Sequence, residues 1–294
     1  MYEEYYGFTE KPFSLTPDPK YLYRSESHAN AIELLQYAID RREGFAVITG
    51  DIGTGKTTLC RALLEQTDKR TFTALLLNPF LSEEDLLKAI LQDLGVLSRS
   101  DERLTRTPSK QDLINTLYDF LLSLIPLGAR AVVSIDEAQN LPLHILEQIR
   151  ILSNLETDKE KLIQIILVGQ LNLAPLLRSP ELRQLDQRIS IRYELKPLSR
   201  EELNAYVAHR LAIANATRQV TFSPKALDLV HQYSGGIPRL INLVCDRALL
   251  GAYSAQTPRI DADIVAAAGA GLDLKPAEPE RKSWISRFWR TQVT

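Results

Sequence analysis

Eight consecutive residues have the types and the spacing needed to hold a phosphate group. The apolar run 45–49 precedes them and an amphipathic stretch follows, which is the strand–loop–helix context of a phosphate-binding loop. Glycines let backbone N–H groups point at phosphate oxygens, and the start of a helix adds a positive dipole. An ordinary glycine-rich turn is the alternative, and the flanking pattern argues against it. The residues fit GxxxxGK[ST]: Gly50, Asp51, Ile52, Gly53, Thr54, Gly55, Lys56 and Thr57.

The side chains of this loop predict ATP and Mg²⁺ as cofactors. We expect the ammonium group of Lys56 to reach the β- and γ-phosphates and the hydroxyl of Thr57 to bind Mg²⁺. Thr58, the next residue along the chain, is included in the predicted nucleotide-binding set.

Two acidic residues, Asp136 and Glu137, follow the apolar run 131–135. Such a run is typical of a buried central strand in a parallel sheet, where ligands bind beyond the carboxyl ends of the strands. We expect Asp136 to hold the Mg²⁺ shell and Glu137 to orient and polarise the attacking water. Taken alone, the pair also suits the start of a helix, where acids match the dipole. The phosphate-binding loop earlier in the chain favours the catalytic interpretation.

Composition indicates a globular nucleotide-binding protein. The chain has 294 residues, 45% of them hydrophobic and 24% charged, which is enough for roughly two domains. The net charge of −2 gives no overall attraction to nucleic acid, although a local basic face stays open. We expect a cytoplasmic protein, because the sequence lacks a long apolar stretch and a signal-peptide pattern. Cys60 and Cys245 are expected to be reduced core residues, and the four histidines lack metal-ligand spacing.

The chain alternates strand and helix patterns in its first two thirds. Such alternation predicts a parallel sheet covered by helices on both faces. Expected strands are 45–49, 71–77, 131–135, 163–168 and 190–195, with helices such as 83–94, 111–124 and 143–155 between them and an exposed loop at 98–109.

After residue 196 the strand patterns stop and four helices are expected, at 200–214, 223–233, 239–253 and 262–268. Ser199 and Glu202 have the spacing of a capping box for the first of them. We therefore divide the chain into an α/β nucleotide-binding domain at 1–197, a helical lid domain at 198–271, and a linker with an amphipathic basic tail at 272–294.

An α/β nucleotide core followed by a small helical bundle is the layout of AAA+ ATPases, and short motifs make the resemblance more specific. The chain resembles the secretion ATPases called ExeA or GspA and their pilus-biogenesis relative MshM. The resemblance covers residues 1 to about 270 and rests on these motifs: Tyr6-Gly7-Phe8, Lys11-Pro12-Phe13, Thr16-Pro17-Asp18-Pro19, Tyr21-Leu22-Tyr23, Gly44-Phe45, Asp136-Glu137-Ala138-Gln139-Asn140-Leu141 and Gly235-Gly236-Ile237-Pro238-Arg239.

The resemblance implies a P-loop AAA+ core with a parallel five-stranded sheet and a small helical lid. It also implies an ATPase whose nucleotide state drives assembly into a ring or filament of identical subunits. Members of the family help to build export or pilus machinery, notably secretin multimers, so a partner in the inner membrane or in secretin assembly is expected.

Further cations are expected near the γ-phosphate, because the transition state of phosphoryl transfer spreads negative charge over its oxygens. Arg239 follows a Gly-Gly-Ile-Pro turn, starts a helix and matches the sensor-2 arginine of AAA+ lids. A solvated arginine is the alternative, although a cation there opposes the helix dipole.

Arg183 and Arg188 precede the last strand, where AAA+ proteins place an arginine finger that enters the neighbouring subunit. Arg188 is nearer the strand and is preferred, with Arg183 as the second candidate, and a plain surface charge is the alternative for each.

Three other residues complete the predicted site. Gln170 follows strand 163–168 and matches the polar sensor-1 position, from which an amide can hold the attacking water with Glu137. Pro12 and Phe13 could flank the adenine base, since a ring face and an apolar edge stack on it. Core packing is the alternative for this pair, and a turn residue without a ligand is the alternative for Gln170.

The segment 281–290 holds both tryptophans of the chain, Trp284 and Trp289. Wound as a helix, it places them on one face with Ile285 and Phe288, and arginines on the other. This pattern predicts a weak peripheral contact with a membrane or with a partner's groove. A tail that is docked on its own core or disordered is the alternative.

A different function class also fits the nucleotide motifs. DNA-associated AAA+ ATPases, such as transposition-target regulators, have similar cores and lids. Nucleic acid is not favoured as a partner, because the net charge is slightly negative and no winged-helix domain is expected after residue 270.

Overall fold

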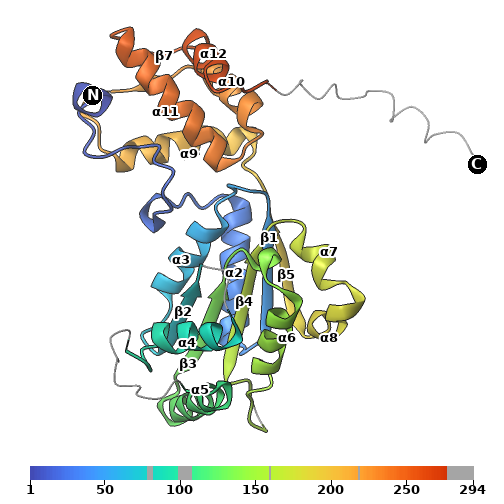
Figure 1. Cartoon of the computed structure of the whole chain (residues 1–294). Coiled ribbons are helices and arrows are strands. Elements are labelled where there is room, and N and C mark those ends of the chain that lie inside the picture. The colour runs from blue at the N-terminus through green and yellow to red at the C-terminus, as the bar shows by residue number, and fades with distance from the viewer. Residues whose placement is uncertain (78–81, 99–107, 159, 218, 277–294) are drawn as a thin grey trace, which may run out of the picture. The chain divides into compact units, whose positions relative to one another are not determined.

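The computed structural model describes residues 1–77, 82–98, 108–158, 160–217 and 219–276 (Figure 1). Its contacts divide the chain into two compact units. The α/β unit comprises Thr16–Pro197, and the helical unit comprises Met1–Leu15 together with the chain from Leu198 onward. The predicted amphipathic tail and most of the predicted loop at 98–109 lie outside the described residues.

The α/β unit is built on five parallel strands in the order β2-β3-β4-β1-β5 (Figure 1). The expected parallel five-stranded sheet is confirmed, and each strand lies within a residue or two of its predicted position. The strands are β1 Phe45–Gly50, β2 Thr71–Leu76, β3 Arg130–Ile135, β4 Ile163–Gly169 and β5 Ile189–Leu195.

Both faces of the sheet are apolar, because β1 and β4 are buried along their whole length. Successive residues of a strand point to opposite faces, so Phe45 and Val47 join one hydrophobic cluster while Ala46 and Ile48 join the other. Helices α4 to α8 cover the first face, and α2 and α3 cover the second. This two-sided cover explains why the strands read as continuous apolar runs.

The helices of the α/β unit start at clear local signals. Serine side chains accept N-terminal backbone N–H groups at Ser25, Ser82 and Ser109, and Asp112 completes a capping box with Ser109. The helices are α2 Glu26–Asp40, α3 Lys56–Gln66, α4 Glu83–Asp93, α5 Lys110–Leu124, α6 Leu143–Leu152, α7 Leu173–Leu177 and α8 Arg183–Asp186, with 3-10 turns Pro19–Tyr21, Ile125–Leu127, Ala138–Asn140 and Pro180–Leu182.

The helical unit contains the expected four helices and the predicted capping box of Ser199 and Glu202. The expectation that strands stop after residue 196 was wrong in one detail, because two short strands pair in parallel, β6 Thr221–Phe222 and β7 Arg259–Ile260. A two-residue strand has no periodicity that a sequence pattern can reveal. The helices of this unit are α1 Tyr2–Tyr6, α9 Arg200–Ile213, α10 Pro224–Ser234, α11 Pro238–Ser254 and α12 Ala262–Ala270.

The first fifteen residues pack with the helical unit, so their predicted place in the α/β domain was wrong. Helix α1 buries Tyr2 and Tyr6, and the hydroxyl of Tyr6 donates to the carbonyl of Thr257 at 2.9 Å. Farther along, the buried guanidinium of Arg210 on α9 donates to the carbonyls of Pro12 at 2.6 Å and Ser14 at 3.1 Å. These long-range polar contacts fix the segment on the helical unit.

A pair of adjacent glycines at the end of α10 gives a matched test of packing in the helical unit. Both have positive φ, +57° at Gly235 and +77° at Gly236. A Cβ at Gly235 would meet nothing within 4 Å, whereas a Cβ at Gly236 would lie 2.0 Å from the carbonyl oxygen of Leu198.

We expect Gly235→Ala to lower the free energy of unfolding of the helical unit by about 1–2 kcal/mol, the cost of a left-handed alanine. Gly236→Ala should cost a further ~1–3 kcal/mol, because the backbone of Leu198 has to move. Urea unfolding of both variants measures the difference. Equal losses of unfolding free energy in the two variants would show that the close approach of Leu198 adds no cost to the substitution at Gly236.

Candidate functional site

The predicted phosphate-binding loop joins the end of β1 to the start of α3. Gly53 and Gly55 have φ of +82° and +99°, values that favour glycine and allow the tight wrap. The ammonium group of Lys56 donates to the carbonyls of Gly50 at 2.9 Å and Asp51 at 2.8 Å. The hydroxyl of Thr54 also donates to the Asp51 carbonyl, at 2.9 Å. The loop is therefore closed on its own lysine, with Thr57 and Thr58 in the first turn of α3.

Strand β3 brings the predicted metal-binding acid to this loop. The hydroxyl of Thr57 donates to the carboxylate of Asp136, which is only 5% exposed. Burial lowers the pKa of Lys56, while Glu137, Asp136 and Asp51 oppose that shift. The loop thus places one buried cation beside acids that stabilise its charged form.

Glu137 follows directly in a left-handed conformation, with φ of +52°. Its backbone N–H donates to Asp136 at 2.8 Å, and its carboxylate accepts from the side-chain amide of Gln170 at 3.3 Å. A positive φ is uncommon outside glycine, and such backbone strain is concentrated at functional sites. The structure brings Thr57, Asp136, Glu137 and Gln170 together at the carboxyl edge of the sheet.

Gln139 is a member of this cluster for which no role was predicted from the sequence. Its amide nitrogen donates to Glu137 at 2.6 Å, and its amide oxygen accepts the backbone N–H of Gln170 at 2.9 Å. Gly169 makes room for it, because a Cβ there would lie 2.6 Å from the Gln139 amide oxygen. The available signal was an amide two residues after the acid, within the Asp136–Leu141 motif.

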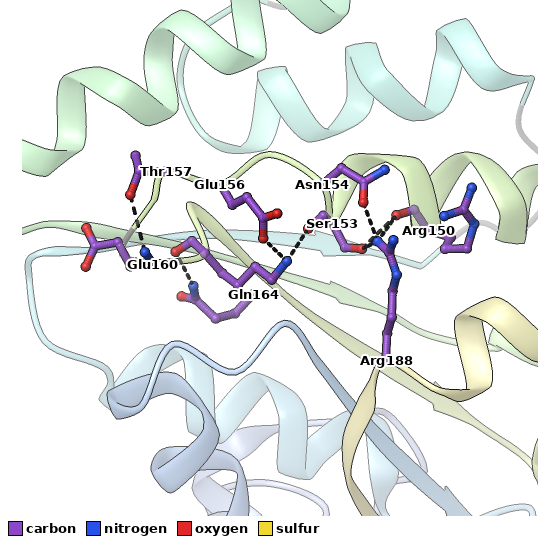
Figure 2. Close-up of polar contacts among 9 residues, drawn as sticks. Arg150, Ser153, Asn154, Glu156, Thr157, Glu160, Gln164 and Arg188 are labelled. Atoms are coloured by element: carbon purple, nitrogen blue, oxygen red, sulfur yellow. Dashed lines mark hydrogen bonds and ion pairs between the residues drawn. The ribbon is translucent and has the colours of Figure 1, made fainter.

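The two candidate arginine fingers differ in their surroundings. Arg188 points toward the end of α6, where its guanidinium donates to the Arg150 carbonyl at 3.2 Å, Ser153 at 2.7 Å and Asn154 at 2.5 Å (Figure 2). A cation suits the negative end of a helix dipole. Arg183 at the start of α8 is exposed, and no hydrogen bond or ion pair of its side chain is found within the described residues.

The remaining predicted residues lie in the helical unit. Arg239 is the second residue of α11 and is exposed. Pro12 and Phe13 are buried, and the ring of Phe13 packs edge-on against Phe222 with centroids 6.3 Å apart. This packing agrees with the alternative interpretation, in which Pro12 and Phe13 belong to the hydrophobic core. Binding of the adenine base by this pair stays a prediction.

Three sequence expectations about chemistry elsewhere can also be compared with the structure. Cys60 and Cys245 are free and buried, and burial raises the pKa of the Cys60 thiol to about 12. Among the residues that the structure describes, no group of three or more His, Cys, Asp or Glu side chains converges as a metal centre. In the same residues, no helix has both the length and the apolar character needed to cross a membrane.

Known sequences support the nucleotide-binding assignment. Residues 39–177 match a family model described as an AAA domain. The chain is 47% identical over 260 residues to General secretion pathway protein A of Aeromonas hydrophila, a match that covers 88% of this chain and 46% of the relative. The chain therefore spans about half the length of that relative.

Solved structures resemble the fold. The ORC2 protein of Aeropyrum pernix, solved as ADPNP–ADP complexes, superposes with a TM-score of 0.67 at 17% identity, covering 92% of this chain and 73% of that one. The RuvB Holliday junction branch migration motor of Thermotoga maritima gives a TM-score of 0.56 at 21% identity, covering 85% and 70%. At such identities the likeness shows the fold alone.

The fold, the loop and the sequence relationship agree with one another. The five-stranded parallel sheet and helical unit have AAA+ architecture, and the close sequence relative carries the more specific assignment. The chain belongs to the AAA+ ATPases of the ExeA/GspA type.

Proposed function

We propose that this protein binds and hydrolyses ATP with Mg²⁺, and that its nucleotide state drives assembly of identical subunits in the service of a secretion or pilus machine of the cell envelope. The observation that carries the catalytic part is the convergence of Thr57, Asp136, Glu137 and Gln170 at the edge of the sheet beside the phosphate-binding loop.

The donor set of this edge fits a magnesium ion. Mg²⁺ prefers hard oxygen ligands and is usually held by one or two protein groups together with substrate phosphates and water. The Thr57 hydroxyl and the Asp136 carboxylate already lie in hydrogen-bond contact, so both oxygens face one position. When bound, the ion would neutralise charge on the phosphates, and Lys56 would supply a second positive charge from the loop.

Glu137 is the proposed base for the attacking water. Gln139 and Gln170 both donate to the same carboxylate, at 2.6 and 3.3 Å, which fixes its direction. Both amides donate to Oε2, so Oε1 is the oxygen that we assign to the water. Gln170 would then act as the predicted polar sensor, since its amide lies beside the base.

A site completed by a neighbouring subunit would link hydrolysis to assembly. An arginine supplied in trans can be worth about 10³–10⁵ in rate. The exposure of Arg183 supports it as that arginine, whereas Arg188 is engaged at the end of α6 in its own subunit. Arg239 remains the proposed sensor of the γ-phosphate from the helical unit. Binding of adenine by Pro12 and Phe13 would require their packing to open.

The envelope role rests on the relative rather than on the site. That protein is named for the general secretion pathway, and the match extends over most of this chain. A partner in the inner membrane or in secretin assembly, and a peripheral membrane contact through the tail at 272–294, follow from this proposal. The DNA-associated alternative draws on solved structures such as ORC1 of Aeropyrum pernix in complex with DNA, at 16% identity, and has weaker support.

The catalytic assignment predicts opposite behaviour for two variants. Lys56→Ala should abolish tight nucleotide binding, because the buried cation of the loop is lost. Glu137→Gln should still bind ATP but slow its hydrolysis by about 10²–10⁴, since only proton transfer from water is removed. Nucleotide binding and phosphate release are measured for both variants. Hydrolysis by Glu137→Gln at the parent rate would show that this acid is not the base.

The contacts of Gln139 predict a positioning role. Gln139→Leu should lower kcat by about 10- to 100-fold, as a small misplacement of a catalytic group does, with little change in nucleotide affinity. Asn140→Ala is the matched control, since Asn140 is the exposed next residue. The kcat and the dissociation constant for ATP are measured for both. A parent kcat in Gln139→Leu would remove the proposed role.

The trans arginine predicts complementation between inactive subunits. Arg183→Ala and Lys56→Ala should each be inactive, and their mixture should regain part of the ATPase rate, because intact sites meet intact arginines. Arg188→Ala is mixed with Lys56→Ala in the same assay. If the role of Arg188 is to hold the end of α6, this mixture should show no gain in ATPase rate over its separate components. Sedimentation with ATP reports assembly. A fully active monomer would contradict any arginine supplied in trans.

A further inference from the structure

A buried histidine lies against the phosphate-binding loop and has no part in the chemistry above. His28 is the third residue of α2 and is only 3% exposed. Its Nε2 atom lies 3.1 Å from the carbonyl oxygen of Thr54, and its Nδ1 atom lies 2.7 Å from the hydroxyl of Ser25. Both ring nitrogens are therefore engaged, one of them by the loop itself.

The partners determine which nitrogen carries the proton. A carbonyl oxygen only accepts hydrogen bonds, so Nε2 must be the donor to Thr54. In the neutral ring Nδ1 then accepts, and the Ser25 hydroxyl supplies that hydrogen. The same Ser25 oxygen accepts the backbone N–H of His28 at 3.3 Å as the cap of α2. The helix cap thus sets the orientation of the ring.

The bond to Thr54 has a consequence for the next backbone donor. In a trans peptide the C=O and N–H bonds point in opposite directions. With the Thr54 carbonyl turned toward His28, the Gly55 N–H is turned away from the imidazole. The ring also approaches the loop closely, since a Cβ at Gly55 would lie 3.1 Å from Nε2.

The first turn of α2 is held by contacts with β5, and this fixes the backbone from which the His28 ring extends. The hydroxyl of Ser27 accepts the backbone N–H of Lys196 at 2.9 Å and lies 3.2 Å from the hydroxyl of Tyr193. These contacts tie the start of α2 to the carboxyl end of β5. Farther along α2, Ala31 and Leu35 are fully buried in the core of the same face.

We propose that His28 is a positioning residue for nucleotide binding. It holds the Thr54–Gly55 peptide so that the Gly55 N–H faces the phosphates and not the protein interior. This inference rests on the proposed binding of nucleotide by the loop. Its effect belongs to binding and not to hydrolysis, because its ring is bound to Thr54 of the loop and to Ser25, whereas the carboxylate of Glu137 is held by Gln139 and Gln170.

Two substitutions separate the hydrogen bond from the space that the ring fills. His28→Met keeps an unbranched side chain of similar volume and removes the donor, whereas His28→Gln keeps a donor at a similar reach. Leu35→Ala is the control for general destabilisation of α2. The dissociation constants for ADP and Mg·ATP, the KM and kcat of hydrolysis, and the melting temperature are measured for the parent and for each variant.

His28→Met should bind both nucleotides about two- to ten-fold more weakly, the effect of one lost hydrogen bond, and raise KM in proportion while kcat stays near the parent value. His28→Gln should recover most of the affinity. Leu35→Ala should lower the melting temperature and leave the affinity unchanged.

Parent affinity in His28→Met, or equally weak binding in His28→Met and His28→Gln, would overturn the proposal. Failure of the proposed function has a different signature, because the parent and Leu35→Ala would then not bind nucleotide at all.

Discussion

The buried ammonium group of Lys56 is the charge around which the α/β unit is organised. Burial penalises this cation. Asp51 and the carbonyls of the loop offset part of the penalty, and so do the acids that directly follow β3. Those acids come from a strand that does not neighbour β1, because β4 lies between the two. The sheet order and the full burial of β4 are therefore requirements of the site as much as of the fold.

Two amide side chains, Gln139 and Gln170, orient the carboxylate of Glu137. Glu137 is held in a left-handed backbone conformation, and Gln139 connects its carboxylate to the backbone of Gln170. The connection needs a glycine at position 169, since any Cβ would displace the amide. One strained residue, one amide bridge and one glycine thus define the direction of a single carboxylate.

Local patterns predicted the strands, Asp136, Glu137 and the capping box at Ser199, because each depends on residues that are close in sequence. His28 and Gln139 could not be assigned roles in this way, since their partners Thr54 and Gln170 lie far along the chain. The preference for Arg188 followed from its nearness to β5, which says nothing about the direction of its side chain. Its contacts at the end of α6 depend on how α6 packs.

The packing of Met1–Leu15 with the helical unit has a consequence for synthesis of the chain. Thr257, the hydrogen-bond partner of Tyr6, is added to the growing chain 251 residues after it. Until α11 and the turn after it leave the ribosome, the aromatic side chains of α1 have no core to enter. The α/β unit, Thr16–Pro197, is synthesised in that interval, so folding of the chain domain by domain would complete this unit before α1 packs.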